Sequence, residues 1–271
     1  MNTLEKSIML TKPLDIHIVS WNRPKMTELV IRTIHRNTNR DNFRLVVLDN
    51  GSNSDTPEKL EALHDNGWID EFIPIKTNLG LEAARNLLLQ ECTQSDYFVC
   101  VDNDCLIMPK KGDKDWLEEL YELMQYFPEY KAIAARTQVM IGTGNIFEKA
   151  DKKNELIVDF PHPGGSYRIM DTKVTSRVGG WHREAPGRGQ EEKYVCGKLR
   201  EAGYKTAFAT EVRCLHLFGT PDTDRWGYPE SFKPEDTGHN DIYHPALEQG
   251  DDKVQLLEYA SKKDVEKYFN A

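Results

Sequence analysis

Two aspartates separated by a single residue stand at the end of an apolar, strand-like run. Residues 97–101 read YFVCV, and Asp102, Asn103 and Asp104 follow directly. Because side chains alternate along a strand, Asp102 and Asp104 are expected to point the same way where the strand ends. Mg²⁺-like ions prefer one or two carboxylates together with phosphate oxygens. The spacing therefore indicates a divalent-metal site that receives a diphosphate, and its alternative is a plain turn, in which Asp and Asn are common.

Strand-like and helix-like segments alternate around these aspartates. The apolar, β-rich runs cover residues 14–21, 44–49, 71–76 and 97–101, and the helix-like stretches cover residues 24–37, 57–66 and 81–91. Pro24 and Pro57 stand where a first helical turn tolerates proline. This alternation predicts βαβ units, an α/β fold and a mostly parallel sheet.

Polar segments follow each of the predicted strands. They read SWNRP (20–24), DNGSNSDT (49–56), TNLG (77–80) and DND (102–104). In parallel sheets, ligands bind outside the carboxyl ends of the strands. We therefore expect these segments to line one edge of the sheet and to form a single site.

The second half has a different pattern. It predicts strands at residues 131–141, 155–160, 205–209 and 212–218, a Pro/Gly loop at 162–166, and helices at 171–178 and 190–202. Residues 219–250 are rich in Pro, Gly, Asp and His and show no periodicity, which predicts a long loop of the kind that is often functional. An amphipathic helix is expected at 253–268.

The composition excludes several function classes. A formal net charge of −9 argues against a general binder of nucleic acids or anionic membranes. No apolar run approaches the roughly 20 residues that span a bilayer, and the N-terminus lacks a signal pattern, so we expect a soluble, cytoplasmic protein. The five cysteines are odd in number and have no C-x-x-C spacing, which favours reduced core thiols over disulfides or structural zinc.

A series of motifs resembles the GT-A glycosyltransferases, closest to the large inverting family 2. In chain order they are IVSWNRP, LDNGSNSDT, NLGLEAARN, YFVCVDND, and a GG followed by an acidic pair and LREAGYK. The resemblance covers residues 14–218. It implies a Rossmann-like sheet flanked by helices, with a nucleotide-sugar-binding half (14–108) and an acceptor or catalytic half (109–218) in one domain, 1–218. Residues 219–271 would pack on that domain as a lid-like loop and a helix.

The resemblance also assigns residues on the donor side. It implies Mn²⁺ or Mg²⁺ held by Asp102 and Asp104, with Asp104 the more dependable ligand. The nucleotide base, expected to be uracil, would lie at Asp49 and Asn50, although relatives often have a second aspartate where this chain has Asn50. The remaining donor contacts that the resemblance implies are Ser20, Asn22, Asn103 and Arg85. An ordinary solvated helix position is the alternative for Arg85.

On the acceptor side, the resemblance places the general base at Glu192. Glu191 would position the acceptor or cap the helix, and the alternative for both is simply favourable negative charge at a helix N-terminus. His216 matches a histidine that completes the metal site or contacts the diphosphate, and its alternative is a core histidine. Trp181 is a candidate platform for the acceptor sugar, with core packing as its alternative.

The function that follows is metal-dependent transfer of a sugar from a nucleotide-sugar, expected to be a UDP-sugar, to an acceptor hydroxyl with inversion. The acceptor is a glycan, a protein or another hydroxyl-bearing molecule. The alternatives are a retaining transferase, including one that acts on a modified nucleic-acid base, a sugar-phosphate nucleotidyltransferase, and a non-catalytic nucleotide-sugar-binding protein. A basic helix face with Arg32, Arg36 and Arg40 is either solvated or a phosphate contact.

Overall fold

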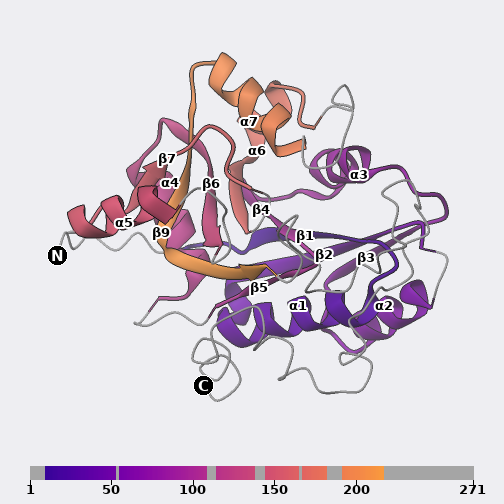
Figure 1. Ribbon diagram of the computed structural model, residues 1–271. Coiled ribbons are helices and arrows are strands. Elements are labelled where there is room, and N and C mark those ends of the chain that lie inside the picture. Colours follow the sequence, from indigo (N-terminus) through magenta and orange to yellow (C-terminus); the bar gives the residue numbers. More distant parts are fainter. Residues whose placement is uncertain are drawn as a thin grey trace, which may run out of the picture.

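The computed structural model describes residues 10–52, 55–108, 114–137, 144–164, 167–181 and 191–216. A nine-stranded sheet lies at the centre of this part of the chain, with helices on both of its faces (Figure 1). The strand order is β3-β2-β1-β4-β8-β6-β9-β5, and β7 pairs with β9 beside this path. The predicted α/β class is confirmed.

The first half of the sheet is parallel throughout. It consists of β1 (Leu14–Ser20), β2 (Phe43–Asn50), β3 (Glu71–Ile75) and β4 (Tyr97–Asp102). Helices α1 (Pro24–Asn37), α2 (Thr56–Asp65) and α3 (Leu81–Leu87) alternate with these strands, and a short 3₁₀ turn, η1 (Arg40–Asn42), precedes β2. In the register, Val19 lies opposite Asp102 and Ser20 lies opposite Asp49, so the polar strand ends meet at one edge as predicted.

The second half of the sheet is mixed. Its strands are β5 (Cys105–Ile107), β6 (Tyr130–Thr137), β7 (Ile157–Asp159), β8 (Arg168–Asp171) and β9 (Lys205–His216). Strand β8 is antiparallel to both β4 and β6, whereas β9 is parallel to β6 and antiparallel to β5 and β7. The helices are α4 (Trp116–Tyr126), α5 (Gly144–Lys153), α6 (Thr172–Arg177) and α7 (Glu191–Glu201).

Several elements differ from the sequence-based expectation. Strand β9 is continuous where two strands were predicted, and α3 passes into a π-helical turn, η2 (Leu88–Cys92), instead of continuing as one α-helix. Elements β5, β8, α4 and α5 were not predicted. The loop expected at 219–250 and the helix expected at 253–268 lie outside the described residues.

Hydrophobic cores lie on both faces of the sheet. The larger core packs α1, α2 and α4 against residues such as Ile16, Leu45 and Ile133. On the opposite face, α6 and α7 pack against Phe98 and Met170, and α3 packs beside them against β2. All five cysteines are free and buried, as expected for reduced core thiols.

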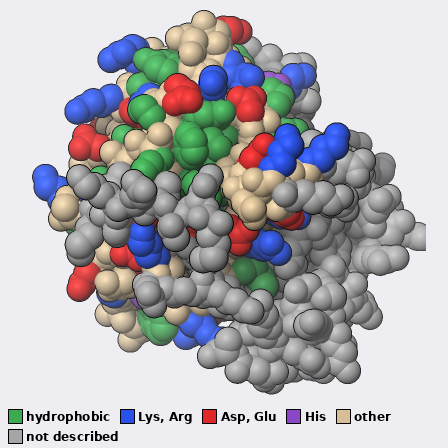
Figure 2. Space-filling view, turned by 90° about the vertical axis from the view of Figure 1, so that its left-hand side faces the viewer, with side chains coloured by type: hydrophobic (Ala, Val, Ile, Leu, Met, Phe, Trp, Pro, Cys, Tyr) green, Lys and Arg blue, Asp and Glu red, His purple; other side chains and the backbone are tan. Residues whose placement is uncertain are grey.

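The surface carries charges of both signs. Basic and acidic side chains are interspersed over the described part of the face drawn in Figure 2. On α1, Arg32 forms an ion pair with Glu28 of the same helix, and Arg40, the first residue of η1, forms one with Asp70. These pairs favour the solvated interpretation of the basic helix face. Among the described residues, every helix is too short or too polar to cross a membrane.

Candidate active site

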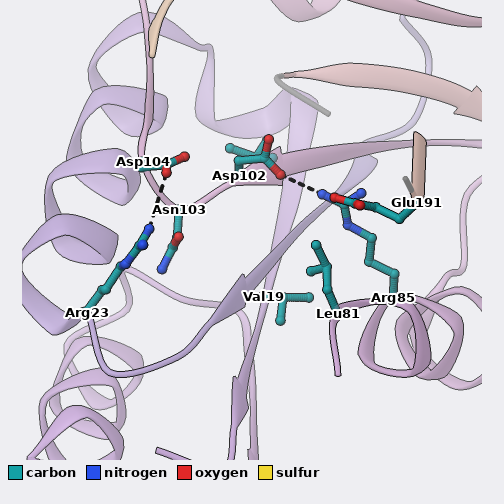
Figure 3. Close-up of a pocket in the computed structure, with 9 residues that line it drawn as sticks. Val19, Arg23, Leu81, Arg85, Asp102, Asn103, Asp104 and Glu191 are labelled. Atoms are coloured by element: carbon teal, nitrogen blue, oxygen red, sulfur yellow. Dashed lines mark hydrogen bonds and ion pairs between the residues drawn. The ribbon is translucent and has the colours of Figure 1, made fainter. Parts of the chain in front are cut away.

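A cavity of about 210 Å³ opens at the carboxyl ends of β1 and β4. It is lined by Val19, Arg23, Leu81, Arg85, Val101, Asp102, Asn103, Asp104 and Glu191. Figure 3 shows the labelled side chains around this cavity, which come from β1 and β4 and the residues that follow each of them, from α3 and from the first residue of α7. Pockets that enclose a whole small-molecule ligand measure about 300–1,000 Å³, so the described walls match only part of such a ligand.

Asp102 and Asp104 both contribute to this cavity, as their spacing predicts. Arg85 Nη2 donates to Asp102 Oδ1 at 2.5 Å, and Arg23 Nη1 donates to Asp104 Oδ2 at 3.2 Å. Asn103 points toward α1, where its Nδ2 lies 3.4 Å from Thr27 Oγ1. Each carboxylate therefore has a guanidinium beside it, from a different element in each case.

The donor atoms of this pair suit a hard divalent cation. One ligand atom each from Asp102, Asp104 and Cys105 lie within 4.8 Å of one another. Carboxylate oxygens are the ligands that Mg²⁺ and Mn²⁺ prefer, whereas a thiol suits softer metals. The Cys105 thiol is buried and lies 3.7 Å from Asp104 Oδ1, as a weak hydrogen-bond donor to that carboxylate. The aspartates thus fit a bound Mn²⁺ or Mg²⁺, and the Cys105 thiol helps to orient the Asp104 carboxylate through its weak hydrogen bond.

Arg85 connects the aspartates to the acidic pair at the start of α7. It is only 4% exposed, its Nη1 lies 3.5 Å from Glu192 Oε1, and its guanidinium lies 5.7 Å from the centre of the Trp181 ring. Burial alone would lower the pKa of Arg85, but the carboxylates of Asp102 and Glu192 raise it further above its ordinary value. Arg85 is therefore a permanent buried cation, which excludes the solvated-helix alternative.

The two glutamates of α7 have different environments. Glu191 lines the cavity, and burial together with the neighbouring Glu192 carboxylate raises the pKa of Glu191 to about 7. Burial alone would also raise the pKa of Glu192, but Arg85 and Arg168 lower it overall. Glu192 is consequently an anion stabilised by the positive charge of Arg85 and Arg168, whereas the pKa of Glu191 is raised to about 7.

Arg168 is a second buried cation, near enough to Glu192 to lower its pKa, and the sequence motifs did not identify it. It is fully buried on β8, directly opposite Cys100 of β4, so its side chain lies on the same sheet face as α7. Its Nη1 donates to the carbonyl of Pro163 at 3.0 Å, and its Nε and Nη2 find no hydrogen-bond partner among the described residues. A buried guanidinium needs a compensating anion, and Glu192 supplies one.

The residues predicted to hold the nucleotide base lie together at the ends of β1 and β2. Asp49 accepts hydrogen bonds from the amide and hydroxyl groups of Ser52, and that hydroxyl accepts one from the Asn22 amide at 2.8 Å. Burial raises the pKa of Asp49 despite these bonds. Ser20 Oγ lies 2.8 Å from Thr27 Oγ1, inside the fold.

Asn50 is occupied by the loop that follows β3. Its Nδ2 donates to Asn78 Oδ1 at 3.1 Å and to the carbonyl of Gly80 at 3.3 Å, and its Oδ1 accepts from the Leu79 amide at 3.0 Å. The Asn50 side chain therefore fixes the loop after β3 against the end of β2. The predicted contact between Asn50 and the nucleotide base stays a prediction, and these hydrogen bonds do not favour it.

Trp181 and His216 are placed differently from each other. Trp181 is 1% exposed and packs in the second core against Phe98, so its burial corresponds to core packing and gives no support to an acceptor platform. The backbone of His216 pairs with Cys105, the residue after Asp104. The end of β9 thus lies beside Cys105, next to the paired aspartates, and the role of His216 as a metal ligand stays a prediction.

Arg23 is a charged residue of the cavity to which the sequence motifs gave no role. It belongs to the SWNRP segment, which was interpreted only through Ser20 and Asn22. Its position directly before Pro24 carries a usable signal, because a basic residue at the end of β1 must lie at the ligand edge of a parallel sheet.

Comparison with known proteins gives a family and a fold. The sequence profile described as Glycosyl transferase family 2 matches residues 15–177, and no sequence among the curated proteins matches significantly. Among solved structures, the chain is similar to the mannosyltransferase PcManGT from Pyrobaculum calidifontis, in complex with GDP-Man and Mn²⁺, with a TM-score of 0.61 and 18% identity. It is also similar to GalNAc-T7 with UDP, GalNAc and Mn²⁺, with a TM-score of 0.60 and 16% identity.

The alignments cover most of this chain and about half of the relatives. They include 78% of this chain and 58% of the mannosyltransferase, and 76% of this chain and 44% of GalNAc-T7. At such identities the likeness shows the shared fold, which is the GT-A fold that the motifs predicted.

Proposed function

Because the chain belongs to glycosyl transferase family 2, we propose that it transfers a sugar from a nucleotide-sugar donor to an acceptor hydroxyl with the help of Mn²⁺ or Mg²⁺. One observation carries this proposal. Asp102 and Asp104, the buried cation Arg85 and the near-neutral carboxyl of Glu191 all meet in one cavity at the carboxyl edge of the sheet. The cavity thus joins groups that suit a metal diphosphate with a group that suits proton transfer.

The donor would lie across the strand ends, with its base toward Asp49 and its diphosphate toward Asp102 and Asp104. Mn²⁺ or Mg²⁺ held by these aspartates, and by His216 if the family position applies, would neutralise charge that develops on the leaving diphosphate. Arg85 stabilises the same charge from within the protein and costs no reorganisation, because it is already fixed by Asp102. We propose a UDP-sugar as donor, although Asn50 leaves the base without the second carboxylate that relatives often provide.

For proton transfer, the geometry supports Glu191 in place of Glu192. A general base works best when its pKa lies near the operating pH and when it can reach the acceptor hydroxyl. Glu191 lines the cavity and titrates near pH 7, whereas Glu192 is engaged by Arg85. We therefore propose that Glu191 takes the proton from the acceptor hydroxyl, which belongs to a glycan, a protein or another molecule. Glu192 would orient Arg85.

A screen of nucleotide-sugars tests the donor class without knowledge of the acceptor. We expect one group of them to raise the melting temperature only when Mn²⁺ or Mg²⁺ is present, because a ligand that binds the native state stabilises it. The same donor should be hydrolysed slowly. If no nucleotide-sugar raises the melting temperature in the presence of metal, the proposal is refuted.

Asp104→Asn tests the metal ligand. We expect this variant to lose metal-dependent stabilisation by the donor while keeping its fold. The matched control is Asp96→Asn, because Asp96 lies just before β4 at the other end of the strand and its side chain is 80% exposed. Equal donor binding by Asp104→Asn and Asp96→Asn in Mn²⁺ would remove Asp104 from the metal site.

A further inference from the structure

The aspartates at the end of β4 are each paired with an arginine. Arg85 reaches Asp102 from α3, and Arg23 reaches Asp104 from the segment between β1 and α1. Figure 3 shows the arginines entering the cavity from opposite sides, with the aspartates between them. The carboxylates lie close enough to repel each other, so the paired cations stabilise the site before any metal binds.

The two arginines differ in how firmly they are held. Arg85 is 4% exposed and is fixed by Asp102, Glu192 and the Trp181 ring. The side chain of Arg23 is 20% exposed, and its contact with Asp104 is 3.2 Å long, compared with 2.5 Å for Arg85 and Asp102. Arg23 is therefore the more accessible of the two arginines, and its contact with an aspartate is the longer one.

We propose that Arg23 is an exchangeable counter-ion, which pairs with Asp104 until a divalent cation binds there and then contacts the diphosphate of the donor. This inference rests on the proposed function and extends it by assigning a donor-binding residue. A guanidinium suits the contact with the diphosphate, because its planar N–H donors can form two parallel hydrogen bonds with phosphate oxygens. Arg23 already lines the cavity that would receive the diphosphate.

Charge balance gives this exchange a consequence for binding. A divalent cation alone would enter a site whose carboxylates are already neutralised, and would leave excess positive charge. A nucleotide-sugar carries one negative charge on each phosphate. Without the metal, these charges would be repelled by the carboxylates of the aspartates. Only the two ligands together restore neutrality, so each should strengthen the binding of the other by the same factor.

Arg23→Gln tests the inference with opposite effects on the two ligands. Calorimetric titration with Mn²⁺ alone should give a dissociation constant about fivefold lower than that of the wild type, since a competing, partly screened cation is gone. Titration with UDP, and in parallel with GDP, at saturating Mn²⁺ should give a dissociation constant about tenfold higher. General damage to the site would weaken both ligands, so the opposite signs separate the exchange from a structural role.

Two further variants serve as controls. Arg23→Lys keeps the charge, so it should restore the wild-type affinity for Mn²⁺ alone while it recovers nucleotide binding only in part. Arg32→Gln makes the same charge change on the exposed part of α1, where Arg32 pairs with Glu28. It should leave both constants unchanged.

The outcomes that overturn the inference are distinct from failure of the proposed function. If Arg23→Gln leaves Mn²⁺ binding unchanged or weakens it, Arg23 is not a counter-ion of the metal site. If the variant binds Mn²⁺ more tightly but binds UDP and GDP as the wild type does, the transfer to the diphosphate is refuted. If the wild type itself binds neither nucleotide with Mn²⁺, the proposed donor class fails and the diphosphate part of the inference fails with it.

Discussion

At the scale of single residues, the acidic pair of α7 shows what spacing alone leaves open. The sequence placed Glu191 and Glu192 at a helix start near the site, and the structure confirms that location. The two glutamates differ because Glu192 contacts Arg85, which lies 107 residues away in the chain, and lies within the electrostatic influence of Arg168. A single sequence contains no local signal for such a long-range ion pair.

The first prediction separates the two glutamates by substitution. Glu191→Gln should bind the donor normally and reduce transfer by about 100-fold, because it removes the proton acceptor and keeps the shape. The measurement is single-turnover transfer together with donor affinity. Glu201→Gln, at the exposed C-terminal end of α7, is the control. Normal transfer by Glu191→Gln together with an inactive Glu192→Gln would return the base to Glu192, and normal transfer by both would exclude a glutamate base.

The pH dependence of transfer gives a second prediction for Glu191. A base must be deprotonated, so kcat/KM should fall as the pH drops below about 7, the pKa of Glu191 in the metal-free protein. A bound cation would move this limb to lower pH. Glu192→Gln removes the like charge that raises the pKa of Glu191. In this variant, kcat/KM should therefore begin to fall at a lower pH than in the wild type. A limb that is identical in both proteins would show that another group titrates.

Stability provides a third prediction, which needs no substrate. The pKa of Glu191 is raised from 4.5 to about 7 on folding, so the native state binds more protons than the unfolded state between these values. Stability attributable to this group therefore decreases as the pH rises through that window. At pH 5 the Glu191→Gln variant should have the same melting temperature as the wild type. At pH 8 the variant should melt at a higher temperature, because its free energy of unfolding is then larger by about 3 kcal/mol at most. Equal melting at both values would indicate an unperturbed carboxyl group.

At the scale of elements, local patterns predicted the first half of the chain well. Helix α1 has the predicted bounds, because Pro24 fixes its first turn and the polar segments around it are local signals. Strands β5 and β8 contain only three and four residues, so they show no periodicity of their own and form because β9 and β4 pair with them. Helix α4 did carry a signal, the capping box of Asp115 and Glu118, which the sequence analysis overlooked.

The loop behind the proposed base site is built around a glycine. A Cβ atom on Gly51 would lie 2.4 Å from the backbone nitrogen of Asn78, and its φ is +73°. Backbone cannot give way as a flexible side chain can, so the turn after β2 and the loop after β3 can approach only because residue 51 is glycine. Asn50 completes the contact by binding the same loop.

Gly51→Ala is therefore a prediction about this pair of loops. It should destabilise the protein more than Gly67→Ala does, because Gly67 has nearly the same φ, +76°, and nothing within 4 Å of an added Cβ. The difference isolates the steric clash, which we expect to cost about 2 kcal/mol and to weaken nucleotide binding. Chemical denaturation of both variants measures it. Equal destabilisation would mean that only the backbone conformation matters.

At the scale of the whole molecule, one core joins the two expected halves. The larger hydrophobic cluster contains residues from β1 and β2 together with Ile133, Ile169 and Val212 of the second half. Across the same boundary, the Tyr167 hydroxyl accepts from the Ile107 amide at 3.2 Å and donates to the Cys105 carbonyl at 3.0 Å. This continuity supports the interpretation of the two halves as one domain.

The last prediction tests that continuity. Ile169 is fully buried on β8, where it pairs with Val99 of the first half and Ile133 of the second. Ile169→Val removes one methylene group and should cost about 1 kcal/mol without preventing folding. If the halves unfold together, hydrogen exchange should report the same loss of protection in β1 as in β6, because both are then exposed by the same global opening. A loss confined to β6 and β9 would show that the acceptor half opens alone, and the boundary between residues 108 and 109 would then separate two folding units.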